Sequence, residues 1–78
     1  MIEKTYSQVD IARWNRIVSA AASSGVEIHG YTGQGSTIGV TLEWRYDPIE
    51  KQLGIKIWSS WIPISQAESF IDTMIQTA

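Results

Sequence analysis

The sequence predicts an α+β domain in which three antiparallel strands form a meander and an N-terminal and a C-terminal helix cover one face of the sheet, in the order α-β-β-β-α. Apolar residues recur at helical spacing near both ends of the chain, and every second residue is apolar through its middle. A sheet with one apolar face buries that face under helices, which gives a two-layer sandwich. The length of 78 residues suits a single domain, residues 1–78.

Composition argues against several functional classes. Hydrophobic residues make up 44% of the chain and charged residues 18%, which is typical of a folded soluble domain. The basic residues are scattered and the net charge is -2, so nucleic-acid binding is not expected. The chain has no cysteine, which excludes disulfides and suits a reducing compartment. No apolar run is long enough for a membrane span, and we expect a cytoplasmic protein that does not enter a membrane.

The first predicted element is a helix over about residues 8–24. Ser7 suits its N-cap, and Asp10 follows three residues later. Residues 23–25 end the helix, because the final glycine can adopt the left-handed conformation of a helix C-terminus. Its apolar face contains Ile11, Trp14, Ile17, Val18, Ala21 and Ala22.

The second predicted element is a short strand over residues 26–31, where the apolar period changes to two. A loop of residues 33–35 is expected to follow and to place Thr32 opposite Ser36 in a hairpin. The resulting register pairs Val26 with Leu42, Ile28 with Val40 and Gly30 with Ile38.

The next two predicted strands form a second hairpin. The first of them covers about residues 37–46, and the Asp47-Pro48 dipeptide is typical of a turn. A loop of residues 48–51 then pairs Asp47 with Gln52, Tyr46 with Leu53, Trp44 with Ile55 and Leu42 with Ile57. On the other face the same register pairs Glu43 with Lys56, which carry opposite charges.

The last predicted element is a helix that continues to the C-terminus. Pro63 ends the third strand, and the segment from Ser65 to Glu68 has the spacing of a capping box. The apolar stripe of this helix contains Ala67, Phe70, Ile71, Met74 and Ile75.

The candidate site lies on the outer face of the predicted sheet. There Gly39 is expected to lie beside His29, and its missing side chain leaves a hollow. The residues predicted to rim the hollow or share its face are His29, Tyr31, Thr41, Glu43 and Trp58. Such a hollow accepts a flat ring, a sugar or a partner's side chain. Alternatively, the aromatic ring of Trp58 protects the glycine backbone, a common arrangement in sheets.

Two classes of function follow from these residues. The first is a non-enzymatic interaction module that binds itself, as a homodimer, or another protein through the outer sheet face or an edge strand. The second is a small ligand-binding protein or enzyme with a shallow site around His29, Tyr31 and Trp58. Small size and the lack of a convergent polar site favour the first class. Neither a metal nor a cofactor is predicted.

Overall fold

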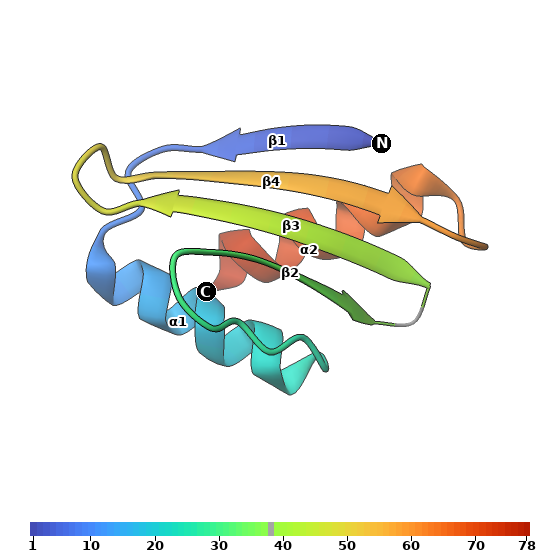
Figure 1. Cartoon of the computed structure of the whole chain (residues 1–78), viewed down its shortest axis with the longest axis horizontal. Coiled ribbons are helices and arrows are strands. Elements are labelled where there is room, and N and C mark those ends of the chain that lie inside the picture. Colours follow the sequence, from blue (N-terminus) through green and yellow to red (C-terminus); the bar gives the residue numbers. More distant parts are fainter. Residues whose placement is uncertain (38) are drawn as a thin grey trace.

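Four strands and two helices form the computed structural model, which describes residues 1–37 and 39–78. The elements are β1 (Ile2–Tyr6), α1 (Ile11–Ser23), β2 (Thr32–Thr37), β3 (Val40–Asp47), β4 (Gln52–Ser59) and α2 (Ile64–Thr77). The sheet has the order β1-β4-β3-β2, and all its neighbouring strands are antiparallel (Figure 1). The α+β class is therefore confirmed, whereas the three-stranded meander is wrong because the sheet has a fourth strand.

β1 is the strand that the sequence pattern did not reveal. It pairs with β4, and Ile2, Lys4 and Tyr6 all stand on the inner side of the sheet. Lys4 interrupts the apolar alternation, because its ammonium reaches the edge of α2, where Nζ lies 3.2 Å from Glu68 Oε1. The chain therefore has the order β-α-β-β-β-α, and α1 follows a strand instead of leading the chain.

The expected strand over residues 26–31 is wrong, because the strand beside β3 is β2. The Gly-Gln-Gly tripeptide that was expected to form a loop lies within β2, and Thr32 pairs with Arg45 instead of facing Ser36. Two expected pairs are absent, Val26 with Leu42 and Ile28 with Val40, and a third, Gly30 with Ile38, lies outside the described residues.

The reason why residues 32–37 form the strand, instead of residues 26–31, lies on the inner side of β2. The indole of Trp44 extends from β3 beneath β2, and a Cβ atom added at Gly33 would lie 2.7 Å from Trp44 Cζ2. A Cβ atom at Gly35 would lie 3.4 Å from Trp44 Cζ3. Close packing therefore requires glycine at residue 33, which sequence patterns do not distinguish from a turn.

The β3–β4 hairpin confirms the predicted register. The confirmed pairs are Asp47–Gln52, Tyr46–Leu53, Trp44–Ile55, Leu42–Ile57 and Glu43–Lys56. Asp47 stabilises the turn, because its Oδ1 atom accepts hydrogen bonds from the backbone N–H groups of Ile49 (3.0 Å) and Glu50 (3.1 Å).

α1 begins later than predicted and uses a different N-cap. Asp10 Oδ1 accepts a 2.8 Å hydrogen bond from the backbone N–H of Arg13, so Asp10 takes the place expected for Ser7. The chain turns just before this point, where Gln8 has a φ of 59°.

α2 begins without the predicted capping box. Pro63 is its N-cap residue, and no side chain caps the first turn. The carboxylate of Glu68 binds Lys4 of β1, so it is drawn toward the sheet instead of back toward Ser65.

The hydrophobic core lies on one face of the sheet, here called the inner face. Alternate side chains of β3 and β4 are buried there against the apolar stripes of both helices. Its members include Leu42, Trp44, Ile55 and Ile57 of the sheet and Trp14, Ile17, Ile71 and Ile75 of the helices. Within the described residues, neither helix packs on the opposite face of the sheet, here called the outer face.

Candidate functional site

The outer face brings together three of the predicted site residues. Thr41 lies directly opposite Trp58, and Glu43 lies opposite Lys56 on the same side of the sheet. Trp58 is partly buried, although no helix covers it. These positions follow from the β3–β4 register, which the turn between the strands determines.

Gly39 is not the open hollow that was expected. It lies in the turn between β2 and β3 with a φ of 75°, a conformation that favours glycine. The indole of Trp61 covers it so closely that any side chain at position 39 would collide with Trp61 Nε1. Trp61 thus takes the covering role that was considered for Trp58, and it remains 72% exposed itself.

Tyr31 and His29 lie away from these residues. Tyr31 packs edge-on against Trp14 and Tyr46, with ring centroids 6.3 Å and 5.4 Å away, which places it on the inner side. His29 lies in the segment between α1 and β2, where its Nε2 atom is 3.3 Å from Glu27 Oε2 and its side chain is 84% exposed. The predicted set is therefore divided between different parts of the molecule.

Charges of both signs alternate across the outer face. Lys56 stands between Glu3 of β1 and Glu43 of β3, and its Nζ atom lies 3.9 Å from Glu3 Oε2. A shallow depression of about 320 Å³ lies over Gly54, with Arg45 on its rim. Because cations and carboxylates are interleaved there, the face has no excess of either charge to attract an ion or a nucleic acid.

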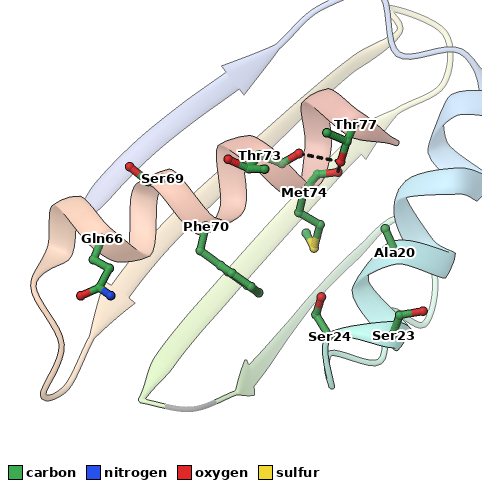
Figure 2. Close-up of a pocket in the computed structure, with 9 residues that line it drawn as sticks. All are labelled: Ala20, Ser23, Ser24, Gln66, Ser69, Phe70, Thr73, Met74 and Thr77. Carbon is green, nitrogen blue, oxygen red and sulfur yellow. Dashed lines mark hydrogen bonds between the residues drawn. The ribbon is translucent and has the colours of Figure 1, made fainter.

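A groove between the two helices was not predicted (Figure 2). Its volume is about 590 Å³, and its lining contains no charged residue. It is lined by Ala20, Ser23, Ser24, Gln66, Ser69, Phe70, Thr73, Met74 and Thr77. The Phe70 ring points into it from α2 and is 42% exposed (Figure 2). Apolar and hydroxyl side chains of this kind offer contact area but no strong acid or base.

The open edge of β2, here called the β2 edge, is the remaining unusual surface. Tyr46 N–H donates a 2.7 Å hydrogen bond to Tyr31 O, and antiparallel ladders alternate along the strand. The backbone groups of Gly33 and Gly35 therefore face β3, whereas those of the alternate residues face away from the sheet. The alternate residues are Thr32, Gln34 and Ser36, which are all exposed.

The segment before β2 follows the strand on its inner side. Thr37 Oγ1 donates to Ser24 O at 3.2 Å, and Trp44 Nε1 donates to Gly30 O at 3.3 Å. Within the described residues, no hydrogen bond reaches the outward backbone groups of the β2 edge. These groups are available to another strand.

Across residues 1–37 and 39–78, no three His, Asp or Glu side chains gather in a way that could hold a metal ion. In the same part of the chain, neither helix is long and apolar enough to cross a membrane.

Comparisons with protein-family models, curated proteins and solved structures find no match for this chain. Its function is therefore inferred from its own geometry.

Proposed function

We propose that the protein is a non-enzymatic interaction module that self-associates by pairing its β2 edge with that of a second copy. The observation that carries this proposal is an open edge without protection: β2 contains no charged residue and no proline in its sequence TGQGST. Natural edge strands usually carry such residues, because a bare edge pairs readily with another strand. A homodimer is the simplest assembly that closes such an edge.

The other edge of the sheet is less suited to self-pairing. In β1, only Glu3 and Thr5 present their backbone groups outward, by the same alternation. Pairing Thr5 with the partner's Thr5 leaves Glu3 opposite the partner's Ser7, which lies beyond the end of β1. Pairing Glu3 with the partner's Thr5 sets Lys4 opposite the partner's Lys4, and pairing Glu3 with the partner's Glu3 opposes two carboxylates. Like charges directly opposite one another destabilise a strand pair.

The alternatives have weaker support. Burying the outer face would desolvate the exposed charges of Glu3, Glu43 and Lys56. A ligand site or active site around His29, Tyr31 and Trp58 would have to bridge both sides of the sheet, because Tyr31 packs on the inner side and Trp58 stands on the outer side.

The test is the mass in solution across a wide concentration range, measured by light scattering. We expect the wild type to be dimeric, and Gln34→Lys to raise the dissociation constant at least about tenfold, because a lysine on an edge strand opposes pairing. Thr5→Lys is the matched control, since it places the same charge on the outer face of the opposite edge strand. Circular dichroism checks that both variants fold.

Two results would overturn the proposal. One is a wild-type protein that stays monomeric at every concentration. The other is a dimer that Thr5→Lys dissociates and Gln34→Lys leaves intact.

A further inference from the structure

We infer that the two copies pair β2 in one antiparallel register, centred on Gln34, so that Gln34 lies opposite the partner's Gln34 and Thr32 opposite the partner's Ser36. This inference rests on the proposed self-association and specifies its geometry. It follows from the alternation of the β2 ladder, from the length of the strand and from the side chains on each face.

The ladder restricts the registers that are available. Only Thr32, Gln34 and Ser36 present backbone groups at the edge, so each must face an outward residue of the partner. The centred register gives every one of them a partner within the strand. A shift that pairs Thr32 with the partner's Gln34 leaves Ser36 beyond the start of the partner's β2, and the opposite shift leaves Thr32 beyond its end.

On the inner face, the two β2 strands themselves bring no side chains into conflict at the centre of this register. Gly33 lies opposite the partner's Gly35, so no side chains meet at the centre. Tyr31 lies opposite the partner's Thr37. Tyr31 is 46% exposed, and pairing would bring a small side chain next to it.

The outer face of the same register brings together only uncharged side chains. Hydroxyl groups meet where Thr32 faces the partner's Ser36, and two amide side chains meet at Gln34. The nearest like charges are Glu43 and the partner's Glu43, separated by three strand spacings, or about 14 Å. That distance exceeds the screening length of about 8 Å at physiological salt.

Single cysteines test the register, because the natural chain contains none. Directly opposite residues in hydrogen-bonded pairs have Cα atoms about 5.5 Å apart, which a disulfide can span. We expect Gln34→Cys to cross-link with itself under mild oxidation at least about tenfold faster than Thr32→Cys or Ser36→Cys alone, whose like positions lie about 14 Å apart. A mixture of Thr32→Cys and Ser36→Cys should form the mixed cross-link rapidly. Thr5→Cys lies on the opposite edge strand, so its cross-linking measures the background rate that arises from random collision.

The outcomes separate this inference from the proposed function. Equal rates for all single variants, or a mixture that fails to cross-link, would overturn the register while a dimeric wild type still supported self-association. A monomeric wild type would overturn both. Circular dichroism of each reduced variant confirms that a slow rate does not arise from loss of fold.

Discussion

At the scale of single residues, Trp44 supplies packing that β2 cannot provide for itself. Its side chain is 5% exposed, its ring lies against Gly33 and Gly35, and Nε1 donates to Gly30 O at 3.3 Å. One indole thus covers the bare inner side of the strand and also fixes the segment that leads into it. The position of the ring requires glycine at residue 33.

Gly33→Ala should destabilise the fold through this contact. The added methyl group would lie 2.7 Å from Trp44 Cζ2, and overpacking of this kind lowers the free energy of unfolding by about 1–3 kcal/mol. Gly54→Ala is the control, because its nearest contact would be Arg45 O at 3.9 Å, an ordinary distance. Urea unfolding of the two variants measures the difference. An equal or larger loss in Gly54→Ala would contradict the packing explanation.

At the scale of elements, β1 is held by α2 as well as by its single neighbouring strand. Tyr6 OH donates to Asp72 Oδ1 at 3.0 Å, and Lys4 Nζ lies 3.2 Å from Glu68 Oε1 and 3.6 Å from Asp72 Oδ1. Burial raises the pKa of Tyr6, and the hydrogen bond to Asp72 raises it further. The hydrogen bond to Glu68 is the main cause that raises the pKa of Lys4.

The attachment of β1 should therefore weaken in alkaline solution. Above about pH 10 the unfolded chain releases the tyrosine proton while the folded chain keeps it, so the free energy of unfolding falls as pH rises. The fall is at most about 1.4 kcal/mol per pH unit for one such group, and Lys4 acts in the same direction. Urea unfolding across this range should show a steeper fall for the wild type than for Tyr6→Phe. Identical pH profiles would show that Tyr6 does not contribute.

At this scale the sequence predicts both helices and the β3–β4 hairpin, but not β1 or β2. The β3–β4 register depends on a local turn at Asp47 and on apolar side chains at every inner position, so the sequence displays it fully. In β2 the inner positions before Thr37 are glycines, because Trp44 of the next strand fills that space. In β1 the inner position of Lys4 is charged, because α2 supplies its partners. In both strands the explanation lies in a different element, which is the next strand for β2 and the C-terminal helix for β1.

The positions of the candidate site residues follow the same pattern. Thr41, Glu43 and Trp58 lie on the outer face, where the sequence predicts them, because all three belong to the β3–β4 hairpin. Tyr31 was assigned to the wrong face, because its position depends on β2, and the cover over Gly39 came from Trp61 beyond the end of β4.

At the scale of the whole molecule, the strand order has a consequence for synthesis. β1 is made first, but its only partner in the sheet is β4, the last strand to be made. Before residues 52–59 exist, β1 has no neighbouring strand and β3 lacks one of its two. Pairings between such distant segments close a long loop and form slowly.

We therefore expect a fragment of residues 1–51 to remain unfolded and to be cleaved quickly by a protease, whereas the full chain resists. Native-like resistance in the fragment would contradict this expectation. In a growing chain β1 would thus stay unpaired until β4 has been made, and the sheet could not be completed before then. A product interrupted before β4 would lack the central pairings of the sheet, and quality-control proteases could remove it readily.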